Sequence, residues 1–370
     1  WSSHKGQSDS WLVNASTWGL MLTGRIVDVA PEAKQDISRF MQNLTRTAGA
    51  PVIRAAMMQA MRIMGEQFVV GRTIDEAIER SVKLGLRKAP GLCSFDMLGE
   101  GARTMADARR YHKAYLDAIH ALGASRGGSK KEPARPEDVN GISVKLSALH
   151  PRYDSAHEEI VMTELYPALF ELAKAAADSD INFCLDAEEA DRLVLSLKIL
   201  DRLAKEPELG EWTGLGLALQ AYQKRSLAVV DYVVDLSRQT GRRLMVRLVK
   251  GAYWDSEIKH SQVEGHEDFP VWTRKSTTDL CYLACARRML EAGDLIFPQF
   301  ATHNAHTVAA IQRMAGPDAA YEFQRLHGMG EPLYRAAERD RRVRIYAPVG
   351  AHEDLLPYLV RRLLENGANT

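Results

Sequence analysis

The sequence lacks the features that define several large classes of protein. Its 370 residues contain only four cysteines, Cys93, Cys184, Cys281 and Cys285, far below the density of a disulfide scaffold. Lys+Arg 48 against Asp+Glu 48 makes the chain formally neutral, so composition gives no case for binding nucleic acid or an acidic membrane surface. No apolar run approaches the roughly 20 residues of a spanning helix, and no signal-peptide pattern occurs. We therefore expect a cytoplasmic protein.

Familiar catalytic and nucleotide-binding motifs are missing as well. Gly214 and Gly216 lie within a predicted strand and lack the third glycine of a GxGxxG turn. The sequence also contains no GxxxxGK[ST] loop, no GxSxG elbow and no HExxH helix. Any cofactor or charged ligand must therefore be recognised by local clusters of side chains.

The first part of the chain, residues 1–92, has the pattern of helices without a catalytic constellation. Residues 51–70 carry an amphipathic stripe at 3–4 spacing, and the Thr73 to Glu76 capping box opens the next helix. We expect an N-terminal helical arm that packs on the main domain or on another subunit. Because the chain starts at Trp1 without Met, we also expect it to be a piece of a longer protein.

From residue 93 onward, β-prone segments alternate with helical ones, which is the signature of βα units and a parallel sheet. A stretch rich in Gly, Ser, Lys and Pro at 123–140 reads as a solvated loop, and 252–296 must hold more than one helix. The predicted strands are 94–100, 142–149, 181–188, 215–222, 244–250, 297–303, 322–327 and 343–348. Eight units over 93–370 predict an α/β fold of the (β/α)8 TIM-barrel type, with a doubly wound sheet as the rival.

The segment 243–254 (RLMVRLVKGAYW) is the most informative single stretch. It opens as an apolar run short enough for a buried strand, turns at Gly251, and places Tyr253 and Trp254 beside two cations. Arg247 interrupts the apolar run, and an arginine is almost never fully buried without a partner. The pattern leaves two interpretations open, a structural ion pair or a contact for an anionic ligand.

Polar residues recur where the predicted strands end, which is where barrel enzymes place their active sites. Period-two alternation puts Lys145 on the same face as Ser143 and Ser147, opposite the apolar residues between them. The full set is Asp96, Glu100, Lys145, Asp186, Glu188, Gln220, Arg247, Lys250, Thr302, His303, Asn304, Gln324, His327 and Tyr346. Such convergence predicts an active site at the mouth of the barrel.

The last helical segment, 355–365, adds a second cluster of charge. Tyr358, Arg361, Arg362 and Glu365 fall on one face at helical spacing. This face is either solvated, with an Arg361–Glu365 pair, or a clamp for a carboxylate or phosphate, because paired guanidinium groups suit planar oxyanions.

A metal site is an alternative use of the same barrel mouth. Asp186, Glu188, His303 and His306 would supply the ligands of a metal-dependent barrel hydrolase. The cations at Arg247, Lys250 and Lys145 would repel a divalent metal ion, so we predict that no metal is bound.

Several long segments resemble the proline dehydrogenase domain of the bacterial bifunctional flavoenzymes of the proline utilization A family. They are 142–153 (ISVKLSALHPRY), 185–193 (LDAEEADRL), 247–256 (RLVKGAYWDS), 299–306 (QFATHNAH), 326–332 (LHGMGEP), 344–350 (RIYAPVG) and 358–367 (YLVRRLLENG). The resemblance covers nearly the whole chain and implies a (β/α)8 barrel that binds FAD without a Rossmann fold. It also implies oxidation of L-proline to Δ1-pyrroline-5-carboxylate, with hydride passing from proline C5 to flavin N5.

The resemblance implies roles for residues already singled out. Lys145, Arg361 and Arg362 would hold the proline carboxylate, Asp186 would organise the pocket, and Glu100 would pair with Arg361 as a gate. Tyr346, Tyr358 and Leu326 would form the walls around the proline ring. The implied flavin contacts are Gln220, Arg247, Lys250, Gly251, Ala252, Tyr253, Trp254, Thr302, His303, Asn304, Gln324 and Glu365.

The resemblance further implies partners for the whole protein. Electrons would pass to a membrane quinone, and the full-length protein would be peripheral at the inner membrane and carry an aldehyde dehydrogenase domain that this chain lacks. We expect binding of L-proline and its analogues and no nucleic-acid contact from this chain. The alternatives are the metal-dependent hydrolase and a non-catalytic barrel that senses amino acids.

Overall fold

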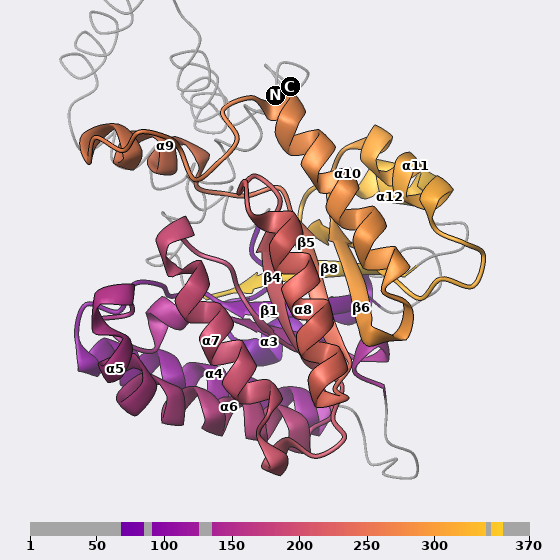
Figure 1. The fold of residues 1–370 in the computed structure, drawn as a ribbon. Coiled ribbons are helices and arrows are strands. Elements are labelled where there is room, and N and C mark those ends of the chain that lie inside the picture. The colour runs from indigo at the N-terminus through magenta and orange to yellow at the C-terminus, as the bar shows by residue number, and fades with distance from the viewer. Residues whose placement is uncertain (1–67, 85–90, 126–134, 338–341, 351–370) are drawn as a thin grey trace, which may run out of the picture. The chain divides into compact units, whose positions relative to one another are not determined.

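A computed structural model describes residues 68–84, 91–125, 135–337 and 342–350, and its centre is a closed barrel of eight parallel strands (Figure 1). Each strand pairs with its neighbours in sequence, and β1 closes the barrel by pairing with β8. The strands are β1 Leu92–Met97, β2 Gly141–Val144, β3 Phe183–Leu185, β4 Leu215–Gln220, β5 Leu244–Val249, β6 Ile296–Ala301, β7 Glu322–Leu326 and β8 Val343–Val349. The predicted (β/α)8 barrel is confirmed, and the doubly wound sheet was wrong.

The described helices are α3 Ile74–Ser81, α4 Met105–Ser125, α5 Glu158–Ile160, α6 Tyr166–Asp178, α7 Leu193–Ala204, α8 Ser226–Thr240, α9 Trp254–Val263, α10 Lys275–Glu291, α11 Ala305–Met314 and α12 Glu331–Ala337. Helix α3 precedes β1 and the other helices follow strands, and helices such as α4, α6, α7 and α8 pack against the outside of the barrel (Figure 1). The segment between β5 and β6 holds two helices, as predicted. None of the described helices has the length and apolarity needed to cross a membrane.

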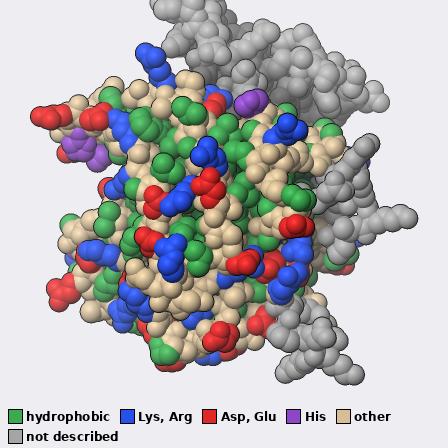
Figure 2. Space-filling model, turned by 45° about the vertical axis from the view of Figure 1, so that its right-hand side comes forward, with side chains coloured by type: hydrophobic (Ala, Val, Ile, Leu, Met, Phe, Trp, Pro, Cys, Tyr) green, Lys and Arg blue, Asp and Glu red, His purple; other side chains and the backbone are tan. Residues whose placement is uncertain are grey.

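Alternation along each strand separates an apolar outer face from the barrel interior. On β5, Leu244, Val246 and Leu248 are buried in the core between strands and helices. Arg247 has the opposite parity and lies inside the barrel, buried among polar side chains. The outer surface, by contrast, mixes charges of both signs on the face drawn in Figure 2. Hydrophobic burial therefore holds the helices onto the barrel, and the interior is left for polar groups.

Strands β2 and β3 are shorter than predicted. The strand predicted at 142–149 ends at Val144, and Leu146–Ala148 forms a 3-10 turn instead. The strand predicted at 181–188 is reduced to Phe183–Leu185. The physical reason is that the chain turns at the mouth, where the backbone N–H of Ser147 donates to Glu188 Oε1 over 3.0 Å rather than to a neighbouring strand. The loop predicted at 123–140 begins later, because α4 continues to Ser125.

The described part of the N-terminal region packs with the barrel. Thr73 caps α3 by accepting a hydrogen bond from the Glu76 backbone N–H, as the capping box predicted. Helix α3 contacts α4, β1 and β8, and the compact unit that contains the barrel spans Val69–Ala351. The amphipathic stripe at 51–70 lies almost entirely outside the described residues, and the arm at 1–92 stays a prediction.

A cluster of polar side chains fills the interior near the amino-terminal ends of the strands. Glu322 Oε1 accepts hydrogen bonds from Gln299, Gln324 and Arg344 over 2.7, 2.9 and 2.7 Å. Arg344 also donates to backbone oxygens of residues 137–139. Both Glu322 and Arg344 are 0% exposed. Bulky branched residues usually fill this position in such barrels, so here mutual hydrogen bonding replaces apolar packing.

Replacing Arg344 by Met would leave the Glu322 carboxylate buried without its cation. Removing one partner of a buried ion pair destabilises a protein by about 3–5 kcal/mol. We expect the free energy of unfolding, measured by urea denaturation, to fall by an amount in that range. Lys205→Met is the control, since Lys205 pairs with Asp201 on an exposed helix, where a pair contributes about 0–1 kcal/mol. Equal losses in the two variants would contradict a stabilising role for this ion pair.

Candidate active site

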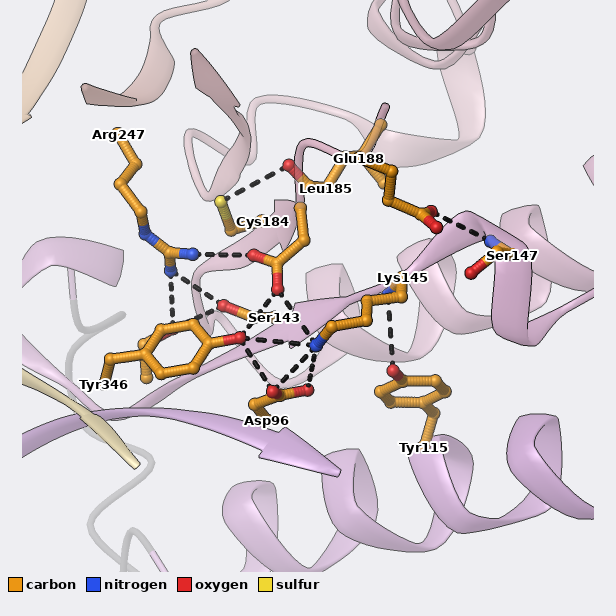
Figure 3. Close-up of polar contacts among 12 residues, drawn as sticks. Asp96, Tyr115, Ser143, Lys145, Ser147, Cys184, Leu185, Glu188, Arg247 and Tyr346 are labelled. Atoms are coloured by element: carbon orange, nitrogen blue, oxygen red, sulfur yellow. Dashed lines mark hydrogen bonds and ion pairs between the residues drawn. The ribbon is translucent and has the colours of Figure 1, made fainter. Parts of the chain in front are cut away.

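Charged side chains from several strands meet at the carboxyl ends of the barrel strands (Figure 3). Lys145 directly follows β2, and its Nζ lies 2.7 Å from each carboxylate oxygen of Asp96 on β1. The same Nζ lies 3.3 Å from Asp186 Oδ2, after β3, and 3.4 Å from the hydroxyl of Tyr346 on β8. The Lys145 side chain is only 8% exposed. The barrel mouth therefore holds an ammonium ion in a fixed place.

Tyr346 connects the two carboxyl groups around that ammonium ion. Its hydroxyl oxygen lies 2.7 Å from Asp96 Oδ2 and 2.7 Å from Asp186 Oδ2. Its ring lies against the Arg247 guanidinium, with Cζ 5.1 Å from the ring centroid, a cation–π contact. Burial raises the pKa of Tyr346 and the neighbouring carboxylates raise it further, so the phenol keeps its proton.

Arg247 on β5 ties these groups to the rest of the barrel interior. Its Nη1 donates to Asp186 Oδ1 and its Nε to Gln324 Oε1, both over 2.7 Å. Its Nη2 donates to the hydroxyls of Ser94 and Ser143 over 2.9 and 2.7 Å. The side chain is 3% exposed. Of the two interpretations of Arg247, the structural ion pair is present, and the ligand contact stays a prediction.

Burial and charge act in opposite directions on the groups at the mouth. Burial raises the pKa of Asp96 by more than the nearby Lys145 lowers it. Burial also opposes the ionisation of Asp186, but the Lys145 and Arg247 cations outweigh it and lower the pKa of Asp186. For Lys145, burial favours the neutral form, yet the surrounding acidic groups raise its pKa well above the usual value. Lys145 therefore keeps its charge at neutral pH.

The segment after β5 turns at Gly251, as the sequence predicted. Its φ is +135°, and a Cβ atom at this position would lie 2.4 Å from the Tyr222 ring, so only glycine fits. Just before the turn, Lys250 forms an ion pair with Asp279 of α10. The turn thus directs a cation toward α10 and starts the next helix within a few residues.

Aromatic residues follow this turn. Ala252 and Tyr253 are half-buried, and Trp254 begins α9. The Trp254 indole N–H donates to the backbone oxygen of Trp272 over 2.8 Å, and the side chain is 41% exposed. An indole ring held at one edge and open to solvent offers a surface on which a planar group can stack.

The predicted cofactor contacts after β6 make hydrogen bonds with their own neighbours. Thr302 Oγ1 accepts the backbone N–H of Asn304, whose side chain caps α11 by accepting the N–H of Thr307. His303 Nε2 accepts the backbone N–H of Leu326 over 3.0 Å, which leaves the hydrogen of this ring on Nδ1. Leu326 itself is half-buried at the end of β7. These bonds fix the shape of the mouth between β6 and β7.

The remaining predicted residues differ in how far the structure describes them. Gln220 is 4% exposed at the end of β4 and accepts a hydrogen bond from Gln223. Gln324 bridges Arg247 and Glu322 inside the barrel. Glu100 lies half-buried in the loop after β1. Four predicted residues lie outside the described part of the chain, namely Tyr358, Arg361, Arg362 and Glu365.

The proposed metal ligands do not converge. Asp186 is paired with Arg247 and Glu188 with Arg192, while His306 lies exposed on α11. Across residues 68–84, 91–125, 135–337 and 342–350, no group of three or more His, Cys, Asp or Glu side chains is arranged to hold a metal ion. The carboxylates of the mouth serve cations of the protein itself.

Sequence reasoning missed several members of this network. Asp96 was placed at the mouth but given no role, and Ser94, Ser143 and Tyr115 were given none either. The Tyr115 hydroxyl accepts the backbone N–H of Lys145 over 3.3 Å from α4. The available signal was parity, because Ser94 lies two residues before Asp96 and Ser143 two before Lys145, so each pair shares one face of its strand.

The fold and the site together define a (β/α)8-barrel protein whose charged side chains converge at the face where this fold places active sites. The profile of the family described as proline dehydrogenase matches residues 79–370. The chain belongs to the proline dehydrogenase family. The resemblance found in the sequence is confirmed.

Individual relatives agree with this assignment. The bifunctional protein PutA of Salmonella typhimurium is 54% identical over 384 residues, which cover 100% of this chain and 28% of that protein. Human mitochondrial proline dehydrogenase 1 is 28% identical over 245 residues, 62% of this chain and 39% of that protein. A crystal structure of a PutA mutant from Bradyrhizobium japonicum has a TM-score of 0.77 and 54% identity, covering 89% of this chain and 33% of that chain. The chain thus spans less than a third of the length of the Salmonella relative.

A second family profile, described as the DNA-binding domain of proline dehydrogenase, matches residues 1–68. This match runs counter to our expectation of no nucleic-acid contact, which was based on formal neutrality. Residues 1–67 lie outside the described part of the chain, so the expectation stays a prediction.

Replacing Gly251 by Ala tests the turn after β5. The new Cβ would overlap the Tyr222 ring in a backbone conformation that alanine rarely adopts, so we expect a loss of about 1–3 kcal/mol in unfolding free energy. Urea denaturation measures this loss. Gly265→Ala is the matched control, since φ is +67° there and no atom lies within 4 Å of the added Cβ. Equal unfolding free energies of the two variants would contradict the structural role of the turn.

Proposed function

We propose that this chain catalyses the FAD-dependent oxidation of L-proline to Δ1-pyrroline-5-carboxylate, the first step of proline catabolism. Membership of the proline dehydrogenase family supports the reaction class. The observation that carries the proposal to the site is the buried Lys145 ammonium at the carboxyl end of the barrel. A fixed cation at the mouth of a barrel is suited to orienting a substrate that carries a carboxylate.

The substrate contacts are assigned within this proposal. Lys145, together with Arg361 and Arg362 of the last helical segment, would bind the proline carboxylate. Tyr346 on β8 and Leu326 at the end of β7 would contact the apolar ring with Tyr358. Glu100, in the loop after β1, would pair with Arg361 over the bound substrate. Asp186 would act indirectly, because it holds Arg247 and Tyr346 in place.

The residues at the mouth also fit a flavin. Each Nη of Arg247 carries two hydrogens, and one on Nη1 has no acceptor among the described residues. Such a donor beside β5 suits an acceptor atom of a planar ring system, while Lys250 suits a phosphate and the open face of Trp254 suits an adenine. FAD, when bound, supplies the two-electron acceptor for the hydride that leaves proline C5.

The other proposed cofactor contacts surround this position. They are Gln220, Gly251, Ala252, Tyr253, Thr302, His303, Asn304, Gln324 and Glu365. The hydrogen bonds that already fix Thr302, His303 and Asn304 support a preorganised site, because these side chains would not need to reorganise when a ligand binds.

Partners beyond the chain belong to the same proposal. Electrons would continue to a quinone, and the full-length protein would be cytoplasmic with peripheral contact at the inner membrane. An aldehyde dehydrogenase domain elsewhere in the full-length protein would consume the product. The name "bifunctional" of the Salmonella relative, of which this chain covers 28%, supports a second activity outside this chain.

An anaerobic titration with L-proline tests the proposal. The purified chain should show the visible absorbance of an oxidised flavin, and added proline should bleach it in a saturable manner. Glycine, which has the carboxylate and the amine but no ring C5, is the control and should leave the spectrum unchanged. A colourless protein with stoichiometric zinc would refute the proposal, and a flavin that proline does not bleach would favour a sensor.

Replacing Lys145 by Met tests the proposed carboxylate contact. A charge-assisted hydrogen bond contributes about 1.5–3 kcal/mol, so we expect the KM for L-proline to rise by about 10–150-fold while flavin remains bound. Lys198→Met is the control, because Lys198 pairs with Glu158 on the exposed surface. Similar KM values for Lys145→Met and the wild type would show that Lys145 does not contact the substrate carboxylate.

A further inference from the structure

The Tyr346 hydroxyl makes more short contacts than its own hydrogen can serve. Its oxygen lies 2.7 Å from a carboxylate oxygen of Asp96 and 2.7 Å from one of Asp186. A phenol carries one hydrogen, so it can donate to only one of these oxygens. Two oxygens at 2.7 Å attract each other only when a hydrogen lies between them. The second contact therefore requires a hydrogen that belongs to a carboxyl group.

Lys145 does not supply this missing hydrogen. Its Nζ donates to both oxygens of Asp96 over 2.7 Å and to the Tyr346 oxygen over 3.4 Å, and it lies 3.3 Å from Asp186 Oδ2. Each of these hydrogens lies between Nζ and one oxygen, so none lies between the phenol oxygen and a carboxylate oxygen. Arg247 donates to the other oxygen of Asp186, Oδ1, and so does not enter the contact with Tyr346 either.

From this count of hydrogens we propose that Asp96 and Asp186 together hold one proton, shared through the Tyr346 hydroxyl, and that Asp96 is a positioning residue for the substrate carboxylate. Asp96 contacts Lys145, and Lys145 is the proposed carboxylate contact, so Asp96 acts through Lys145. The inference rests on the proposed function for the identity of that carboxylate.

The charges around the pair agree with this assignment. Asp96 is 1% exposed and has Lys145 as its cation, whereas Asp186 is paired with both Lys145 and Arg247. Burial raises the pKa of Asp96, and the two cations outweigh burial to lower that of Asp186. The shared proton therefore rests mainly on Asp96. Tyr115 is the other titratable group that faces Asp96, and burial keeps its phenol neutral.

The shared proton sets the charge that a ligand meets. Lys145 and Arg247 contribute two positive charges, and the carboxyl pair with one proton contributes one negative charge, so these four groups carry one net positive charge. A single carboxylate neutralises it. If both carboxyl groups were ionised, the four groups would already be neutral, and an entering carboxylate would be repelled by Asp96 behind the ammonium. The proton thus makes Lys145 available to an anionic substrate.

The same count of charges gives the direction in which carboxylate affinity changes with pH. Below the pKa of the pair the proton is present and a carboxylate binds at full strength. As the pH rises through that pKa, the pair gains a negative charge and the Kd for a carboxylate should increase, by up to about tenfold per pH unit. The Asp96→Asn variant cannot gain this charge, because its amide stays neutral, so its Kd should not rise in the same range.

Infrared difference spectroscopy tests the proton directly. The wild-type chain at neutral pH should show the carbonyl band of a protonated carboxylic acid that shifts in D2O, and D96N should lack it. D235N is the matched control, since Asp235 lies on the exposed surface, and its spectrum should retain the band. Should D96N fail to fold, D96S serves the same purpose, because its spectrum also lacks the Asp96 carboxyl band. A wild-type spectrum without a carbonyl band that depends on Asp96 overturns the proposal.

Calorimetric binding of cyclopentanecarboxylate tests the use of the proton. This probe has the ring and carboxylate of proline but no amine, so it does not titrate in the working range and needs no turnover. Wild type and D235N should lose affinity relative to D96N as the pH rises, and parallel profiles for wild type and D96N overturn the positioning role. An absence of flavin bleaching by proline in a protein that passes both tests would refute the proposed function alone.

Discussion

The interior of this barrel depends on the guanidinium group of Arg247. It donates to Ser94, Ser143, Asp186 and Gln324, which belong to β1, β2, the end of β3 and β7. A buried guanidinium without partners would be too unfavourable to persist, so its acceptors have to occur together on separate strands. Through Asp186 the same group orients Tyr346 and limits where Lys145 can lie. The active-site geometry is therefore a consequence of how one buried cation is satisfied.

The two faces of the strands divide stability and chemistry between them. The outward residues of the strands, such as Phe95 and Leu248, are buried against helices and contribute hydrophobic stabilisation that does not depend on pH. The inward residues include Arg344 and Glu322 near the amino-terminal ends and Lys145 at the mouth. Polar side chains inside are tolerated because they hydrogen-bond to one another, and their partners come from strands that the apolar outer core already holds in register.

The sequence predicts the architecture well and the site in part. Eight β-prone segments separated by helical ones were sufficient for the barrel, and alternation correctly put Lys145 on an inner face. The ends of the strands were less predictable, because Leu146 and Ala148 continue an apolar pattern through what is a 3-10 turn. Ser94 was not singled out and Ser143 was placed on the inner face without a role, because a serine in a strand carries no distinctive signal until its partner is known. Which hydroxyl receives Arg247 is a property of the closed barrel and not of any one strand.

Under the proposed function, the network also accounts for how a site with so many internal contacts would bind a carboxylate. A carboxylate that enters the mouth meets an ammonium already held by Asp96, so its affinity depends on the difference between two sets of contacts. A shared proton between Asp96 and Asp186 reduces the competing charge without moving any side chain. Rigid placement of Lys145 then becomes an advantage, because no entropy is lost in ordering it when the ligand arrives. Charge balance in the free protein is thus what makes preorganisation compatible with binding.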